Sequence, residues 1–449
     1  MFAESINQPK TISYAGPTLQ KDRIAIIDSL RGFAILGILL MNIGSFSMGG
    51  GQGFDLTLKN ETGINYNIWY AVNMLDGTQR ALFSMLFGAG ILLFIRSVER
   101  KVEGIQVADY FFRRQLWLLV FSLFDVFVLL WLGDILLDYA LWGMVLFTFR
   151  KLPAKALLIA AGVCFVFMIA RETRDLYKDK RTIFRGETVA AIDTTKVALS
   201  ATQKDYLSAM ATFKNQSTLE AKRQRMETAV RNTAHGSYEQ LYDMRTDRYV
   251  NTLVRYIFYE LWDVLLFMFL GMAFFKIGVL TGKVPTRVYF LFTAIGLGVG
   301  IFLTNIFLQQ FLRYNFNRYD VTKNVVFQSY TLGRVFRSIG LFGLIMLMYK
   351  SGLFKWLFAL VRPVGQMAFT NYLSQSLICG IIFYSVGFGL FGQLERYQVY
   401  LVVLGVWIFQ IIFSNIWMRN FRFGPFEWLW RSLTYWKKQP MKRERLNIE

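Results

Sequence analysis

Residues 24–46 read IAIIDSLRGFAILGILLMNIGSF, a long apolar run interrupted by three polar side chains. Asp28 and Arg31 lie near its start, and Asn42 lies near its end. A run of this length can cross the hydrocarbon core of a bilayer as one helix, and polar groups in a membrane span usually serve a function. In a helix, Arg31 and Asn42 lie on one side, about 16 Å apart along the axis. The run therefore predicts a first membrane span with a cation near one membrane face and an amide near the other.

The composition of the whole chain indicates a membrane protein with many spans. Of its 449 residues, 54% are hydrophobic and 17% are aromatic, and the mean hydropathy is +0.36. Soluble domains of ordinary composition are less apolar. The formal net charge of +20 would favour nucleic-acid binding in a soluble protein, but here Lys and Arg collect in short segments between apolar runs, as the positive-inside rule requires. We therefore expect contact with the lipid bilayer and no nucleic-acid partner.

The predicted fold class is all-α, a polytopic membrane protein with about ten transmembrane helices and a helical extracytoplasmic insertion. Apolar runs of sufficient length lie at about 24–46, 80–97, 114–132, 134–150, 154–170, 254–276, 286–312, 331–349, 364–386 and 398–418. Every second connecting segment is rich in Lys and Arg. By the positive-inside rule, this alternation predicts that both termini are cytoplasmic. The segments predicted to lie outside are 47–79, 171–253, 313–330 and 387–397.

A change in composition divides the chain. Residues 171–253 are polar and charged, and they separate two predicted bundles of five spans each, 24–170 and 254–418. A segment at 1–23 precedes the first bundle, and a basic tail at 419–449 follows the second; we expect both to be cytoplasmic. Apolar residues near helical spacing predict two or three amphipathic helices in the polar segment. Two interpretations stay open for it: a variable cover over the outer face, or a lid or docking surface for an extracytoplasmic substrate.

The chain contains one histidine, His235, within the polar segment. A Ser-His-Asp or Cys-His site inside the membrane is therefore excluded, as is a metal site with several histidines. Cys164 and Cys379 lie in separate apolar runs, without the short spacing of a zinc motif. We expect no metal site, and aspartates stay as the candidate bases.

Two aspartates near the membrane faces each have two interpretations. Asp28 precedes Arg31 by three residues, so the two side chains form an ion pair in a helix. Alternatively, Asp28 orients Arg31 while this guanidinium binds a phosphate or carboxylate of a cytoplasmic ligand. Asp134 follows a glycine at a predicted outer turn, at the same membrane face as Asn42. It either caps the next helix or serves as a general base or hydrogen-bond anchor.

Other polar side chains in the apolar runs are candidates for lining a cavity. Arg334 is predicted near the outer face, where it would hold an anionic substrate or extend to the interface. The amides of Asn371 and Gln375 either join helices by hydrogen bonds or bind substrate in a polar cavity. The Gly88 and Gly90 pair favours close contact between helices.

Five segments of the chain together resemble one family. They are RIAIIDSLRGFAILGILLMNI (23–43), LDGTQRALFSMLFGAGILL (75–93), LLWLGDILLDYALWG (129–143), GQMAFTNYLSQSLI (365–378) and SNIWMRNFRFGPFEWLWRSLTY (414–435). These segments look like the successive motifs of the YeiB-like bacterial membrane proteins, a family described as a domain of unknown function. The resemblance covers nearly the whole chain apart from 171–253. It implies a multi-pass protein of the bacterial inner (plasma) membrane.

The first span of this family is similar to that of transmembrane acyltransferases of the heparan-alpha-glucosaminide N-acetyltransferase and acyltransferase-three types. This resemblance implies that an acyl group passes from a cytoplasmic donor such as acyl-CoA to an acceptor, a small molecule, glycan or lipid, on the other side. In the acyltransferase-three pattern, an arginine precedes a catalytic histidine by eleven residues. Here Arg31 matches the arginine, and Asn42 occupies the place of the histidine. The acetyltransferase type has a histidine about eleven residues further on, where this chain has Gly53.

The leading hypothesis is an acyltransferase-like protein that lacks the usual catalytic histidine. Arg31, with Asp28, would bind the anionic donor, Asn42 would hydrogen-bond the acyl carbonyl or the acceptor, and Asp134 would act as base. The alternative is a transporter or flippase that uses the same cavity without covalent chemistry. Acyl transfer across the membrane requires a continuous polar cavity from Arg31 to Asn42 and Asp134. The sequence determines neither the acceptor nor whether the chain forms a homo-oligomer.

Overall fold

The fold is known from a computed structural model that describes residues 24–49 and 53–443. Within these residues the chain forms α-helices, one short 3-10 helix at Leu56–Leu58 and no β-strand. The all-α prediction is therefore confirmed. In chain order the α-helices are α1 Ala25–Ser47, α2 Gly63–Asn73, α3 Thr78–Glu99, α4 Ile105–Phe127, α5 Leu136–Leu146, α6 Ala154–Ala190, α7 Ala201–Gln216, α8 Leu219–Ala234, α9 Tyr238–Lys276, α10 Thr286–Arg313, α11 Arg318–Asn324, α12 Tyr330–Ser351, α13 Lys355–Gln366, α14 Ala368–Phe383, α15 Arg396–Asn420 and α16 Pro425–Tyr435.

Each of the ten predicted spans falls on a helix, but the number of ten membrane crossings is not confirmed. In the described part of the chain, seven helical segments are long and apolar enough to cross a membrane: Ala25–Ser47, Gly63–Glu99, Ala154–Ala190, Ile257–Lys276, Thr286–Arg313, Tyr330–Ser351 and Arg396–Asn420. The helices at Leu136–Phe149 and Ala368–Phe383 are apolar but shorter. α4 carries Arg113, Arg114 and Asp125 in its apolar sequence. The ten predicted spans were apolar stretches of sequence. Of the helices that form there, α5 and α14 are short and α4 carries charged residues.

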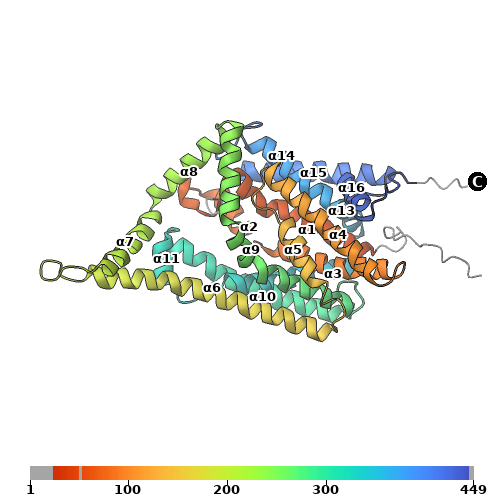
Figure 1. Cartoon of the computed structure of the whole chain (residues 1–449), viewed down its shortest axis with the longest axis horizontal. Helices are drawn as coiled ribbons and strands as arrows, with labels where there is room; N and C mark the ends of the chain where they lie inside the picture. Colours follow the sequence, from red (N-terminus) through yellow and green to blue (C-terminus); the bar gives the residue numbers. More distant parts are fainter. Residues whose placement is uncertain (1–23, 50–52, 444–449) are drawn as a thin grey trace, which may run out of the picture.

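α6 and α9 extend well beyond the helix bundle and hold α7 and α8 between them (Figure 1). They contain 37 and 39 residues, so each is about 55 Å long or more at 1.5 Å per residue. The hydrocarbon core of a bilayer is only about 30 Å thick. Figure 1 shows their extensions and the two intervening helices as a triangular arch, at the end of the molecule opposite to α16. Two complete helices thus lie within 171–253, as predicted.

Local capping sequences define the helices of the arch. Ser200 begins α7 with a capping box: its hydroxyl accepts from the Gln203 amide, and the Gln203 side chain accepts from the Ser200 amide. The far part of α6 is held by α11, because Glu187 accepts hydrogen bonds from Lys323 Nζ at 2.5 Å and from the Tyr319 hydroxyl at 3.0 Å. The bond from Lys323 lowers the pKa of the Glu187 carboxyl. The arch is therefore fixed to the bundle rather than free of it.

Glycines allow the long helices of the bundle to approach closely. A Cβ atom at Gly88 of α3 would overlap the backbone of Met268 in α9, and one at Gly271 would overlap the backbone of Met85. The close contact expected at Gly88 is therefore present. Small residues serve this purpose in membranes because they let two backbones make extensive van der Waals contact.

α16 returns to the bundle and caps another helix. Its side chain Glu427 accepts hydrogen bonds from the amides of Phe369 at 2.7 Å and Thr370 at 3.1 Å, and from the Thr370 hydroxyl at 2.5 Å. These amides belong to the first turn of α14 and have no partner within that helix. Trp430 of α16 donates to the carbonyl oxygen of Arg114 at 2.9 Å. The helix thus joins α4 to the start of α14.

Glu427→Ala is expected to lower the free energy of unfolding by about 1–3 kcal/mol, because three buried donors lose their acceptor. Glu427→Gln keeps one acceptor oxygen and should lose less. Thermal unfolding in detergent, followed by tryptophan fluorescence, measures both variants. An Ala variant as stable as the natural protein would show that α16 does not support α14.

Candidate functional site

A cavity of about 470 Å³ opens between α1, α3, α4, α5, α14 and α16. Its lining contains five arginines and two carboxylates: Arg31, Arg96, Arg100, Arg114, Arg431, Asp28 and Glu427. Aromatic and aliphatic side chains line the rest, among them Phe83, Phe87, Leu118, Leu136, Tyr139, Phe369 and Tyr372. Along α3 the lining runs from Phe83 to Ser97, about 21 Å at 1.5 Å per residue. We call this space the arginine cavity; it is cationic at one end and apolar at the other.

The first and last described segments of the chain meet at this cavity. Ile24, at the start of α1, and Tyr435, at the end of α16, both line it. Arg96 lies in the last turn of α3, and Arg100 follows the end of that helix. The arginine cavity therefore opens at the membrane face that carries the basic connecting segments, which we call the basic face.

Arg31 and Asp28 lie at the arginine cavity as the ion pair that their spacing predicts. Arg31 Nη1 donates to Asp28 Oδ1 at 3.4 Å, and Gln366 Nε2 donates to Asp28 Oδ2 at 3.2 Å. Gly90 faces this pair, since a Cβ there would lie 3.3 Å from Arg31 Nη2. Gly90 thus leaves room for the guanidinium, while Asp28 orients it. The pair is both structural and part of the cavity wall, so the two interpretations of Asp28 do not exclude each other.

Arg114 is held between two aromatic rings. Its Cζ lies 4.7 Å from the centre of the Phe94 ring and 4.5 Å from that of Trp430. Its Nη1 is buried and makes no hydrogen bond to any described residue. Arg431 and Arg31 are close enough to repel its charge. A buried donor without an acceptor is costly, so an anion bound beside Arg114 would satisfy this donor.

The inner end of the arginine cavity has two tyrosines. The Tyr139 hydroxyl lies 2.7 Å from the Ser84 hydroxyl. The Tyr372 hydroxyl donates to Asp134 Oδ1 at 3.1 Å and accepts from the Ile135 amide at 3.2 Å. Tyr372 therefore forms the wall between the cavity and Asp134.

Asp134 caps α5. It accepts from the amides of Leu136 at 3.0 Å and Leu137 at 3.1 Å, and from the hydroxyl of Ser122. These bonds are those of an N-cap, the first of the two predicted interpretations. Its oxygens are directed to α5, Ser122 and Tyr372, and it does not line the arginine cavity.

The continuous polar cavity from Arg31 to Asn42 and Asp134 is not formed by the described residues. Asn42 is half-buried on α1 and is absent from the lining. Between the levels of Arg31 and Asn42, the side chain of Gln79 packs against Gly37. Beyond Asn42, Phe46 stacks on Trp131 with ring centres 3.7 Å apart. Helical spacing placed Arg31 and Asn42 on one side of α1, but different neighbours pack against that side at the two levels.

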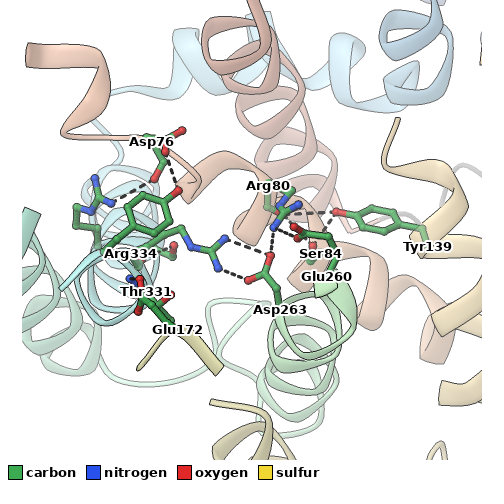
Figure 2. A network of polar contacts seen from close by, with 12 residues as sticks. Asp76, Arg80, Ser84, Tyr139, Glu172, Glu260, Asp263, Thr331 and Arg334 are labelled. Atoms are coloured by element: carbon green, nitrogen blue, oxygen red, sulfur yellow. Dashed lines mark hydrogen bonds and ion pairs between the residues drawn. The ribbon is translucent and has the colours of Figure 1, made fainter. Parts of the chain in front are cut away.

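Beyond Tyr139 lies a network of charges in which Asp263 and Arg334 are buried and Arg80 and Glu260 are partly exposed. Figure 2 shows Asp263 between the guanidinium groups of Arg80 and Arg334. Arg80 also pairs with Glu260 at 2.6 Å, and Arg334 Nη1 donates to Asp263 at 3.2 Å. Arg334 is only 4% exposed. Both oxygen atoms of the Asp263 carboxylate thus accept hydrogen bonds, and two nitrogen atoms of Arg334 donate to them.

The two amides proposed for substrate binding join helices. Asn371 Nδ2 donates to the Val364 carbonyl at 3.1 Å and to the Ser414 hydroxyl at 3.0 Å. Gln375 Nε2 donates to the Ile35 carbonyl and to Gln410 Oε1, both at 3.1 Å. Neither residue lines the arginine cavity. They connect α14 with α1, α13 and α15.

Most of the arginine cavity was not predicted from the sequence. The basic segments that contain Arg96, Arg100 and Arg431 indicated only the membrane orientation, and the segment around Glu427 and Trp430 indicated only a family resemblance. One signal was available, because a Glu, a Trp and an Arg at 427, 430 and 431 share one face of a short helix. The structure describes no group of three or more His, Cys, Asp or Glu side chains that could hold a metal ion. His235 is exposed at the end of α8.

Comparison with known proteins supports one family. Residues 274–437 match the family model described as "Protein of unknown function (DUF418)". The chain is 29% identical over 460 aligned positions to "Uncharacterized protein YxaH" of Bacillus subtilis (strain 168), covering 95% of this chain and 98% of that protein. It is 29% identical over 418 positions to "Uncharacterized protein YeiB" of Escherichia coli (strain K12), covering 92% and 96%.

A protein of Bacillus acidopullulyticus, "Uncharacterized 39.9 kDa protein in amylase 3'region", is 24% identical over 434 positions, covering 95% of this chain and 97% of that protein. No solved structure matches the chain. The relatives align over nearly their full lengths, so the similarity includes both halves of the bundle. The apolar helices and these similarities together indicate an integral membrane protein that is similar over nearly its whole length to YxaH and YeiB and matches the DUF418 family model at residues 274–437.

Proposed function

We propose that this membrane protein binds an acyl donor of the acyl-CoA class in the arginine cavity and transfers its acyl group. The observation that supports this proposal is the combination, in one cavity, of five arginines and an apolar end. Guanidinium groups bind phosphate through paired hydrogen bonds, and an acyl chain gains free energy among aromatic and aliphatic side chains. The positive-inside rule assigns the basic face to the cytoplasm, where such donors occur.

The transfer step is an acyl substitution at the inner end of the cavity. An acceptor hydroxyl or amine attacks the thioester carbonyl, a new bond to carbon forms, and the carbon–sulfur bond breaks. The acceptor loses a proton and the departing thiolate gains one, so the step needs no further reactant. Tyr372 lies at the cavity wall and donates to Asp134 at 3.1 Å, which gives this proton a route to a carboxylate. Asn42 lies outside the cavity and has no part in this version of the mechanism.

Purified protein in liposomes, supplied with a panel of acyl-CoAs, should release free thiol. Arg31→Ala should raise the KM for the donor about tenfold or more, because a charge-assisted hydrogen bond to phosphate is worth about 1.5–3 kcal/mol. Arg318→Ala is the control. This exposed side chain belongs to α11, which contributes no residue to the cavity lining, so the variant should leave KM unchanged. Absence of thioester turnover, together with donor binding that Arg31→Ala does not alter, would contradict the proposal.

One observation favours a transporter as the second candidate. The arginine cavity opens at the basic face and is followed by the ion pairs that the buried Asp263 makes with Arg80 and Arg334. A transporter open to one side has such an arrangement, with binding near the midplane and a closed path beyond it. Uptake of a labelled anionic solute that Arg114→Gln abolishes, without any thioester turnover, would favour this function.

A further inference from the structure

A second hollow lies on the outside of the bundle, at the base of the arch. It is a groove of about 580 Å³ between residues 167–178 of α6 and 258–262 of α9. It shares no lining residue with the arginine cavity. In Figure 1 these two helices diverge from the bundle to form the arch. We call it the α6–α9 groove.

The groove is apolar at one end and basic at the other. At the apolar end, Phe167 stacks on Trp262 with ring centres 4.5 Å apart. Phe258, one turn away on α9, is 64% exposed. Arg171, Arg174 and Lys178 follow on the same face of α6, at spacings of three and four residues. The apolar sequence of α6 ends at Ala170 and the charged sequence begins at Arg171. The groove therefore crosses the level at which a membrane changes from hydrocarbon to headgroups, and aromatic side chains are typical of this level.

Arg171 has a guanidinium that the described residues leave unsatisfied. Its Cζ lies 3.7 Å from the centre of the Tyr259 ring of α9. Its Nε and Nη1 are buried without a hydrogen-bond partner among the described residues. Arg174 is paired with its neighbour Asp175 at 2.8 Å, so the lining carries three cations and one anion. Buried N–H donors on a cation need an acceptor, and an anion supplies it best.

We propose that the α6–α9 groove binds an anionic phospholipid, with its phosphate at Arg171 and Lys178 and an acyl chain along Phe167 and Trp262. The basic end matches the charge of the headgroup, and the apolar end is exposed where the hydrocarbon of the bilayer lies. Clusters of basic side chains beside a membrane helix attract anionic headgroups. A zwitterionic lipid fits less well, because its own ammonium group would lie among the three cations. The bound lipid would fill the angle between α6 and α9 and so stiffen the base of the arch.

The test is lipid binding to the full chain purified in a neutral detergent. Native mass spectrometry and thermal unfolding are recorded with phosphatidylglycerol, with phosphatidylcholine and with inorganic phosphate. We expect binding of phosphatidylglycerol to be about tenfold tighter or more than that of phosphatidylcholine, since each basic side chain near an anionic headgroup adds to the attraction. Arg171→Gln with Lys178→Gln should remove this preference.

The control is Arg181→Gln with Lys204→Gln, which removes the same charge from exposed positions of α6 and α7 outside the groove. It should keep the preference for the anionic lipid. Equal binding of the two lipids, or an equal loss in the control, would overturn the proposal. Stabilisation by inorganic phosphate alone would do so as well, since it would indicate a soluble anion. Acyl-CoA turnover is measured in parallel, and its outcome bears on the proposed function rather than on this site.

Discussion

Arg114→Gln is expected to weaken binding of an acyl-CoA donor by about ten- to one-hundredfold. The guanidinium lies in the wall of the arginine cavity, its Cζ lies 4.7 Å from the ring centre of Phe94 and 4.5 Å from that of Trp430, and its Nη1 has no partner among the described residues. A charge-assisted hydrogen bond contributes about 1.5–3 kcal/mol, and the aromatic sandwich means that little freedom is lost when the bond forms. Isothermal titration of the detergent-purified protein with CoA and acyl-CoA measures the effect.

The neighbouring arginine offers a matched control on the same helix. Arg113 pairs with Asp109 and lies over the Trp436 ring, outside the arginine cavity. Arg113→Gln should leave donor affinity unchanged. Arg114→Lys keeps the charge but not the planar fork, so it should recover only part of the affinity. A folded Arg114→Gln variant with natural donor affinity would show that the cavity binds something other than a phosphate-bearing donor.

Asp263→Ala is expected to cause the largest loss of stability, about 3–5 kcal/mol, because it leaves charges buried without their partner. Asp263 accepts from both Arg80 and Arg334, and the Asp263 and Arg334 side chains are each only 5% exposed (Figure 2). The midpoint of unfolding in a detergent and denaturant series measures the loss. Replacement of the pair by Asp263→Leu with Arg334→Met should recover much of it, since Arg80 keeps Glu260 and no buried cation is left alone.

An exposed ion pair provides the comparison. Arg318 and Asp179 lie 2.9 Å apart with side chains 69% and 36% exposed. Asp179→Ala should cost only about 0–1 kcal/mol, because water solvates both charges. Similar losses for Asp263→Ala and Asp179→Ala would show that the buried network is not a major source of stability.

The sequence by itself determined the class of protein and the local features of its helices. Composition and the length of apolar runs are properties of single segments, so they predicted an all-α membrane protein and the approximate positions of its helices. The spacing of Asp28 and Arg31 predicted their ion pair, because residues three apart on a helix are neighbours whatever surrounds it. Gly88 predicted a close helix contact for a similar reason, since a glycine lets another helix approach closely whichever helix that is.

Only the tertiary structure decided which polar side chains meet. Arg31, Arg114 and Arg431 come from α1, α4 and α16, and the packing of these helices brings them to one cavity. The same packing places Arg334 in an ion pair with Asp263 and leaves Asn42 outside the cavity that Arg31 lines. The physical reason is that each helix in a bilayer can rotate about its axis with little change in apolar exposure to lipid. The side that a polar residue faces is therefore set by the neighbouring helices, whose positions no single segment encodes.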